Sequence, residues 1–155
     1  SCPYMALDQF DEKLLNIISR DARSSITELS TQVGLSKTPC HARLRKLEEQ
    51  GYILGYRALL DPIKLGREHV AFVEVKLSDT RASALQKFND TVRELPEIEQ
   101  CHMIAGGFDY LLKVRTASIS SYRQFLGEAI STLPNVAQTS TYVAMEAVKD
   151  TTVLS

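Results

Sequence analysis

Two helix-start signals stand close together in the first third of the chain, with one glycine between them. The tetrapeptide Ser-Ile-Thr-Glu at 25–28 is a capping box, in which the Ser and Glu side chains each accept a backbone N–H of the other residue. Gly34 can take the left-handed conformation that ends a helix, and Ser36 is a favourable N-cap for the next. This predicts helices over 26–33 and 36–50 joined by a very short turn, which is typical of a helix-turn-helix unit.

Another helix is predicted upstream, over 8–20, by apolar residues at helical spacing. These residues are Phe10, Leu14, Ile17 and Ile18. In the 36–50 helix, Cys40, Leu44 and Leu47 recur at intervals of four and three residues and should face the same core. The first part of the chain is therefore predicted to pack as a three-helix core.

The opposite face of the 36–50 helix has the composition of a DNA-reading element, since no acidic residue occurs between Ser36 and Leu47. Short polar side chains reach base edges in the major groove, an arginine can bond guanine, and flanking cations can contact phosphates. The predicted DNA-binding residues are Ser36, Lys37, Thr38, His41, Ala42, Arg43, Arg45 and Lys46. The alternative is an ordinary solvated helix face, but the adjacent capping box and glycine turn favour binding to double-stranded DNA.

The residues after these helices indicate a domain boundary. Residues 52–60 are rich in Tyr, Ile and Leu, which predicts a strand that serves as a wing or as a dimer contact. Pro62 and Gly66 lie in a polar segment that indicates a linker. We therefore expect a winged helix-turn-helix domain over 5–60, a linker over 61–68 and a second domain over 69–150.

The second domain reads as a duplicated unit. Alternating apolar residues predict strands over 69–77, 98–105, 108–116 and 136–148, and helical spacing predicts helices before Pro96 and before Pro134. Leu95-Pro96-Glu97-Ile98 is echoed by Leu133-Pro134-Asn135-Val136 at an offset of 38 residues, which aligns Phe72 with Tyr110 and Phe88 with Leu126. The order βαββαβ predicts a ferredoxin-like α+β domain, with helices on one face of an antiparallel sheet.

The sheet face without helices would expose apolar residues such as Val70 and Phe72. An exposed apolar sheet face is unusual in a monomer, so we expect at least a homodimer.

Several other classes of protein are disfavoured. The cysteines Cys2, Cys40 and Cys101 are odd in number and far apart, which fits neither a disulfide framework nor a metal site. No apolar run approaches the roughly 20 residues that span a bilayer, and the start lacks a secretory pattern, so we expect a cytoplasmic protein without a membrane partner. No cofactor is predicted. The histidines His41, His69 and His102 show no nucleophile–base pairing, so an enzyme is not expected.

The ordered set of motifs resembles the Lrp/AsnC (feast/famine) family of transcriptional regulators from about residue 7 to 150. The motifs are Asp11 to Leu15, Ser36 to Cys40, Arg43 to Glu48, Gln50 to Ile53, Gly106 to Lys113, Leu133-Pro134 and Thr141 to Val143. The resemblance implies sequence-specific DNA binding, and dimerisation through the strand after the helix-turn-helix and through the C-terminal sheets. It also implies assembly to octamers and a small effector, usually an amino acid, bound between subunits.

The resemblance further implies an effector site near the glycine pair. Its candidate residues are Ala105, Gly106, Gly107, Phe108, Asp109, Tyr110, Thr139, Thr141, Tyr142, Val143 and Ala144. The glycine backbone could hold a carboxylate and Asp109 an ammonium, or the glycines are only a tight strand connection that Asp109 caps. Small side chains at 105, 107 and 144 could reshape the pocket, so no particular effector follows.

Two other functions stay open. One is an architectural DNA-binding protein without an effector. The other is a tetrapyrrole decarboxylase of the kind that resembles this family.

Overall fold

The computed structural model describes residues 6–152, and the chain divides into two compact units, one ending at Ala58 and one beginning at Leu59. Each unit has its own cluster of buried apolar side chains.

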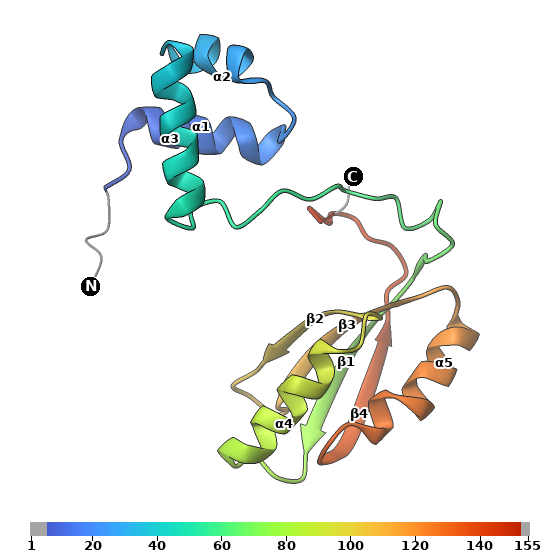
Figure 1. Ribbon diagram of the computed structural model, residues 1–155. Coiled ribbons are helices and arrows are strands. Elements are labelled where there is room, and N and C mark those ends of the chain that lie inside the picture. The colour runs from blue at the N-terminus through green and yellow to red at the C-terminus, as the bar shows by residue number, and fades with distance from the viewer. Residues whose placement is uncertain (1–5, 153–155) are drawn as a thin grey trace. The chain divides into compact units, whose positions relative to one another are not determined.

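The N-terminal unit consists of α1 (Gln9–Arg20), α2 (Ile26–Val33) and α3 (Lys37–Glu49), as Figure 1 shows. The predicted capping box is present before α2, where the Ser25 side chain accepts the Glu28 N–H and the Glu28 side chain accepts the Ser25 N–H. Gly34 ends α2 with φ of 81°, in the left-handed region that glycine adopts without strain. The predicted helix-turn-helix is confirmed.

The core of this unit lies where the helices meet. Leu14 of α1, Leu29 of α2 and Leu47 of α3 are at most 1% exposed, and Cys40 is fully buried beside them. Leu14, Cys40 and Leu47 occupy the helix faces that the sequence periodicity assigned to the core. Burying side chains of this size contributes about 1.5–3 kcal/mol each, so this small core is the main stabilising feature of the unit.

The predicted strand over 52–60 is wrong for the single chain. No strand occurs between α3 and His69 in the described residues, and Leu54 is 97% exposed. A strand requires a neighbouring strand for its backbone N–H and C=O groups, and the helical N-terminal unit offers none. Residues 52–60 therefore form no wing strand within the described part of the single chain.

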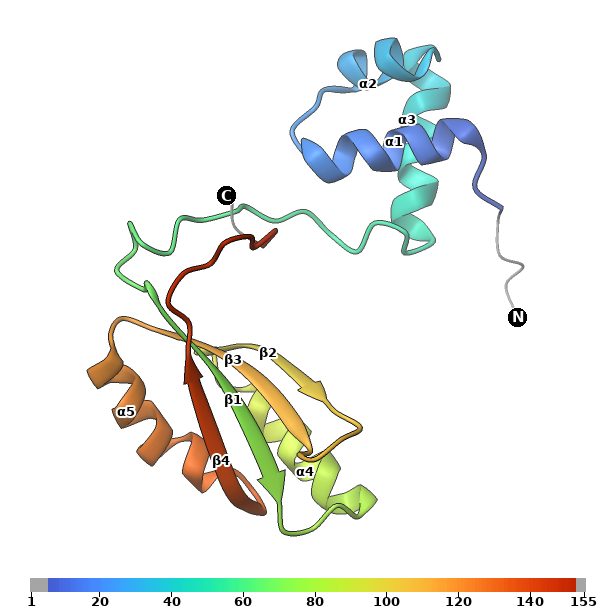
Figure 2. The same cartoon turned by 180° about the vertical axis from the view of Figure 1, so that it is seen from behind.

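The C-terminal unit is a sheet covered on one face by helices. Its elements are β1 (His69–Leu77), α4 (Ala82–Arg93), β2 (Ile98–Met103), β3 (Tyr110–Thr116), α5 (Ile119–Glu128), η1 (Ile130–Thr132) and β4 (Val136–Val143). The strands pair antiparallel in the order β2-β3-β1-β4. Figure 1 shows α4 in front of the strands, and Figure 2 shows the strands in front of α4 from the other side. The predicted ferredoxin-like α+β fold is confirmed.

The predicted duplication holds for the elements but not for every aligned side chain. The order β1-α4-β2 is repeated as β3-α5-β4, and Phe88 and Leu126 both pack on the core. Phe72, however, is 38% exposed on the face without helices, whereas Tyr110 is 1% exposed on the helical side. Successive strand residues face opposite sides of a sheet, so residues on opposite faces are not equivalent in the two repeats. The predicted alignment of Phe72 with Tyr110 at an offset of 38 is therefore wrong, and the true offset between β1 and β3 is an odd number.

The fourth strand is shorter than predicted, because β4 can pair only as far as β1 extends. Val143 is opposite Ala71, and Ala144 donates one further hydrogen bond to the Val70 carbonyl at 2.9 Å. No partner strand is available beyond that point. Among the helices of residues 6–152, none has the length and apolar character needed to cross a membrane.

Candidate functional site

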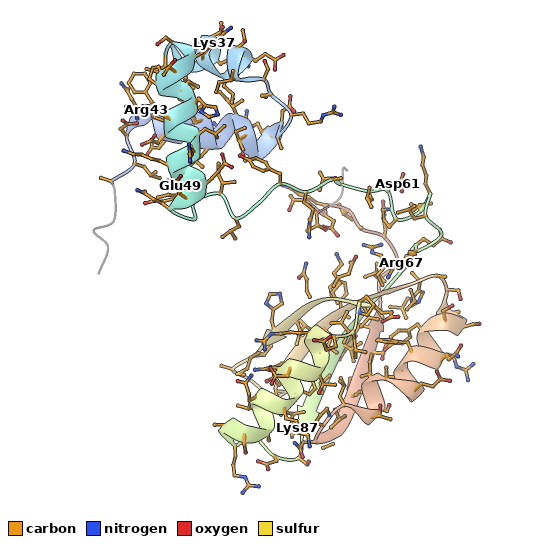
Figure 3. All side chains as sticks on the ribbon, viewed as in Figure 1. Lys37, Arg43, Glu49, Asp61, Arg67 and Lys87 are labelled. Carbon is orange, nitrogen blue, oxygen red and sulfur yellow. The ribbon has the colours of Figure 1, made fainter. Side chains whose placement is uncertain are left out.

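The outward face of α3 is a continuous accessible surface. Seven of the eight predicted DNA-binding residues are exposed, namely Ser36, Lys37, Thr38, His41, Ala42, Arg45 and Lys46. Figure 3 labels Lys37 and Glu49 at the two ends of the helix. The first acidic side chains of α3 are Glu48 and Glu49, in its last turn, so its N-terminal part presents only neutral and basic groups. This is the end that a recognition helix directs at bases.

Arg45 is the arginine on this face with the greatest freedom to reach a base. Among the described residues its side chain pairs with Glu49 alone, at 3.0 Å from Nε to Oε1, and the two side chains are 73% and 62% exposed. A pair this exposed contributes little to stability, so the guanidinium can exchange Glu49 for a guanine edge at small cost.

Arg43, which the sequence placed among the phosphate contacts, lies elsewhere. Its guanidinium pairs with Asp8 and Asp11 in the first turn of α1 and lies over the Phe10 ring, 5.1 Å from the centroid. The Asp11 carboxylate is almost completely buried. The structure thus conflicts with Arg43 as a DNA contact and gives it the role of holding α3 against α1. Residue spacing alone could not reveal a partner more than 30 positions away.

In the C-terminal unit, the glycine pair lies in an exposed loop between β2 and β3. Ala105, Gly106 and Gly107 are exposed, and Phe108 is half-buried. The loop is closed at its base by Asp109, whose backbone carbonyl accepts the Ile104 N–H at 2.8 Å. The Asp109 carboxylate accepts the Leu77 N–H at 2.7 Å, so it is already engaged within the chain.

Three predicted effector residues face the helical layer instead. Tyr110 donates its hydroxyl to Asn89 of α4 at 2.6 Å. The Thr141 hydroxyl is hydrogen bonded to that of Tyr122 in α5, and Thr139 is on the same side of β4 as Thr141. These bonds engage the hydroxyls of Tyr110 and Thr141 inside the unit. The alternation along β4 was the signal for this, since every second residue must point toward the helices.

The remaining candidates, Tyr142, Val143 and Ala144, do not join the loop in one pocket. Tyr142 and Val143 are about half exposed and lie at the end of β4. On β1, Phe72 is opposite Tyr142 of β4, and Val75 is opposite Tyr110 of β3 at the end of the glycine loop. These positions are three residues apart, so roughly 10 Å along β1 separates the loop end from the end of β4, and the two groups of residues lie on different strands. In the single chain the predicted effector residues thus fall into two separate groups, called here the half-sites of the predicted effector site.

The sequence reasoning missed a charged cluster on the face of the sheet opposite α4 and α5, called here the open face. Lys113 and Arg115 of β3 are 7% and 6% exposed, and each pairs with Glu99 of β2. Asp150 lies 2.5 Å from the Lys113 Nζ. The pair Lys113 and Arg115, two residues apart in an otherwise apolar strand, was the available signal.

A hollow of about 1430 Å³ lies over this cluster on the open face. Val70 and Phe72 line it together with the charged pair, and residues 144–150 form another part of its wall. Of the predicted effector residues only Ala144 lines it, so this hollow is not the site implied by the glycine loop.

Comparison with known families separates the same two parts of the chain. A family model described as winged helix-turn-helix DNA-binding matches residues 7–53. The model of the Lrp/AsnC ligand binding domain matches residues 70–154, more than half of the chain. The chain belongs to the Lrp/AsnC family. It is therefore a DNA-binding transcriptional regulator with a ligand-binding domain, as the resemblance implied.

Curated Lrp/AsnC relatives match along nearly the whole chain. A proline dehydrogenase transcriptional activator of Rhizobium radiobacter is 61% identical, with 94% of this chain and 93% of the relative covered. The leucine-responsive regulatory protein of Escherichia coli K12 is 48% identical, with 95% and 90% covered. Among solved structures, a transcriptional regulator of Neisseria meningitidis in complex with L-methionine has a TM-score of 0.89 at 30% identity, with 97% of each chain covered.

Proposed function

We propose that this Lrp/AsnC regulator reads DNA sequence through the exposed face of α3 and that an amino acid bound between subunits controls its activity. DNA reading is supported by the N-terminal stretch of α3, which has no acidic residue and in which Thr38, His41 and Arg45 are all exposed. These side chains can donate to or accept from base edges, and Lys37 and Lys46 can contact phosphates beside them.

The two half-sites support an effector bound between subunits. The loop at 106–108 offers backbone N–H groups, and Tyr142 and Val143 offer exposed apolar surface at the other end of the sheet. An amino acid needs both, because its carboxylate is held by N–H donors and its side chain by apolar contacts. A neighbouring subunit that brings one half-site against the other completes the pocket.

The open face supports a homodimer, which forms the basis for octamers in this proposal. Phe72 is 38% exposed in the middle of the sheet, and Tyr142, opposite it on β4, is 55% exposed. Placing two such faces together removes these rings from water, at about 25 cal/mol for each Å² buried.

The names of two relatives suggest the regulated gene. Proteins named proline dehydrogenase transcriptional activator, from Rhizobium radiobacter and Rhodobacter capsulatus, are 61% and 58% identical to this chain. We extend this activity to the present chain, with the gene for a proline dehydrogenase as its target. A regulator of a catabolic gene is useful if it senses the substrate of the encoded enzyme, so proline is our first candidate effector.

The test uses fluorescence anisotropy with DNA from upstream of a proline dehydrogenase gene of the same genome, and with a scrambled duplex of equal length. We expect at least a thousandfold preference for the upstream DNA at physiological salt. Equal affinity for both duplexes would support the architectural alternative instead.

The effector is tested separately by thermal unfolding in the presence of each of the twenty amino acids. A ligand at 100 times its Kd stabilises by about 2.7 kcal/mol, which shifts the midpoint visibly. A shift with proline and not with other amino acids supports the proposal. No shift with any amino acid removes the effector part and leaves the DNA test standing. Absorbance titration with a tetrapyrrole tests the decarboxylase alternative, for which no binding is expected.

A further inference from the structure

The end of β1 has a backbone group that its neighbouring strands do not satisfy. The pairing of β1 with β3 ends where Val75 is opposite Tyr110. The pairing of β1 with β4 is irregular between Lys76 and Leu77. The Leu77 N–H therefore lies beyond the regular ladder in a residue that is only 6% exposed, and a buried N–H without an acceptor is costly.

Asp109 supplies the missing acceptor. Its carboxylate accepts the Leu77 N–H at 2.7 Å, and its own N–H donates to the Val75 carbonyl at 2.9 Å. Its carbonyl accepts the Ile104 N–H, just after the end of β2, at 2.8 Å. One residue thus ties the ends of β1, β2 and β3 together, with the side chain taking the place that a further β3 residue would fill in the ladder.

This arrangement frees the loop that precedes Asp109. No hydrogen bond in the described part of the chain uses the N–H groups of Gly106, Gly107 or Phe108. The loop also has space around it, because a Cβ on Gly107 would meet nothing within 4 Å and one on Gly106 would meet only the Ile104 side chain, at 3.6 Å. If β3 continued its ladder through residue 108, these donors would be turned toward β1.

We propose that Asp109 is a positioning residue, which shapes the loop at 106–108 for the effector through its bond to Leu77 and does not itself bind the effector's ammonium. This inference rests on the proposed effector site and assigns a different role to its one carboxylate. The bond to Leu77 requires an acceptor oxygen at this position but not a negative charge.

Asp109→Asn separates the two roles. The asparagine amide oxygen can accept the Leu77 N–H but carries no charge to attract an ammonium. With the amino acid that stabilises the wild type, isothermal titration should give a Kd for D109N within about threefold of the wild-type value. D109A should weaken binding by about tenfold or more. Equal losses of tenfold or more in D109N and D109A would overturn the proposal, because only the charge is missing from both.

Hydrogen exchange at the Leu77 amide provides a readout that needs no effector. The amide should be protected in the wild type and in D109N, and should exchange at least about tenfold faster in D109A. Asp79→Ala is the matched control, because Asp79 is also a carboxylate near the end of β1 but, among the described residues, its carboxylate bonds only to Arg81. It should leave both effector binding and Leu77 exchange unchanged.

The two measurements separate failure of this inference from failure of the proposed function. If the wild type binds no amino acid, the effector site fails, and unchanged Leu77 exchange in D109A would then overturn the positioning role as well. If D109A does not fold, D109N alone decides, since retained binding supports positioning and a tenfold loss identifies a charged ligand contact.

Discussion

Nη1 of Arg43 lies 3.2 Å from Oδ1 of Asp11, and the same nitrogen pairs with Asp8, so one guanidinium closes on both acidic residues of the α1 capping box. The bond from the Asp11 N–H, and secondly the one from Arg43, lowers the pKa of the Asp8 carboxyl below its ordinary value. The start of α1 is thus linked to the middle of α3. Because α3 carries the proposed DNA contacts, this link fixes the reading face relative to the rest of the N-terminal unit.

Removing either partner of this link should destabilise the N-terminal unit. Asp11→Ala and Arg43→Ala should each lower the midpoint of thermal unfolding by several degrees, and the double variant should lose clearly less than the sum of both. The loss in R43A should be at least as large as in D11A, because R43A leaves the buried Asp11 carboxylate without its cation, whereas D11A leaves Arg43 paired with Asp8. Additive losses, measured by calorimetry, would show that the two side chains do not interact.

The salt dependence of DNA affinity distinguishes side chains that contact phosphate from Arg43, which holds α3 against α1. Lys37→Ala should reduce the slope of log affinity against log salt concentration by about 1, which corresponds to one lost phosphate contact. Arg43→Ala should leave the slope unchanged even where the affinity falls. A reduced slope in R43A, measured by anisotropy from low to high salt, would return Arg43 to the DNA contacts.

Arg45→Ala should relax the choice between DNA sequences. A bidentate contact with guanine is worth about 1–3 kcal/mol of discrimination, so the preference for the cognate site should fall by roughly 5- to 150-fold. Arg93→Ala is a matched control, because Arg93 also forms an exposed ion pair on a helix, with Asp90 at 3.0 Å. Unaltered discrimination by R45A would exclude this arginine as the specificity contact.

Phe72→Asp should break the proposed dimer. The new carboxylate would lie opposite Lys113, a cation that already pairs with Glu99 and Asp150, so the interface would bury a carboxylate in excess, which costs several kcal/mol. Light scattering after size exclusion should show smaller particles than the wild type at the same concentration. Ser83→Asp, at an exposed position of α4, adds the same charge away from the open face and should not change the assembly. Wild-type mass for F72D would exclude the open face as an interface.

The ion pair between Asp150 and Lys113 should make the free energy of unfolding depend on pH in the acid range. Hydrogen bonds from Lys113 and then Thr152 lower the pKa of the Asp150 carboxyl well below its ordinary 3.8. A group with a lowered carboxyl pKa stabilises the fold fully above the ordinary pKa, and this stabilisation is lost progressively as pH falls from the ordinary pKa through the lowered one. Asp150→Asn should therefore cost about 1–3 kcal/mol at neutral pH. The difference from the wild type should shrink below about pH 4. A difference that is constant with pH in urea unfolding would contradict this role.

Local signals predicted most of the fold. The capping box before α2, the glycine after it and the alternation in β1 each act within a few residues, so they could be read directly from the chain. The prediction of a strand over 52–60 is wrong for the opposite reason, since a strand depends on a partner strand that the local pattern of residues does not reveal.

The candidate sites were less predictable, because their residues depend on distant partners. Arg43 has the sequence context of a phosphate contact, and only the packing of α1 on α3 reveals Asp11 as its partner. Asp109 likewise has the context of a ligand, and only the end of the β1 ladder shows that its carboxylate is engaged. The exposed residues of α3, which need no partner within the chain, were located correctly on its accessible face.

The complete burial of Cys40 makes this thiol a reporter of the integrity of the N-terminal unit. Cys101 belongs to the C-terminal unit, where burial raises the pKa of its thiol to about 11 and leaves little reactive thiolate. A chemical label can therefore reach Cys40 only when the N-terminal unit opens, whereas the partly buried Cys101 reacts slowly through its small thiolate fraction until the sheet opens. With Cys2 replaced by serine, the chain carries one latent tagging site in each unit, so the opening of the two halves can be timed independently in the same molecule.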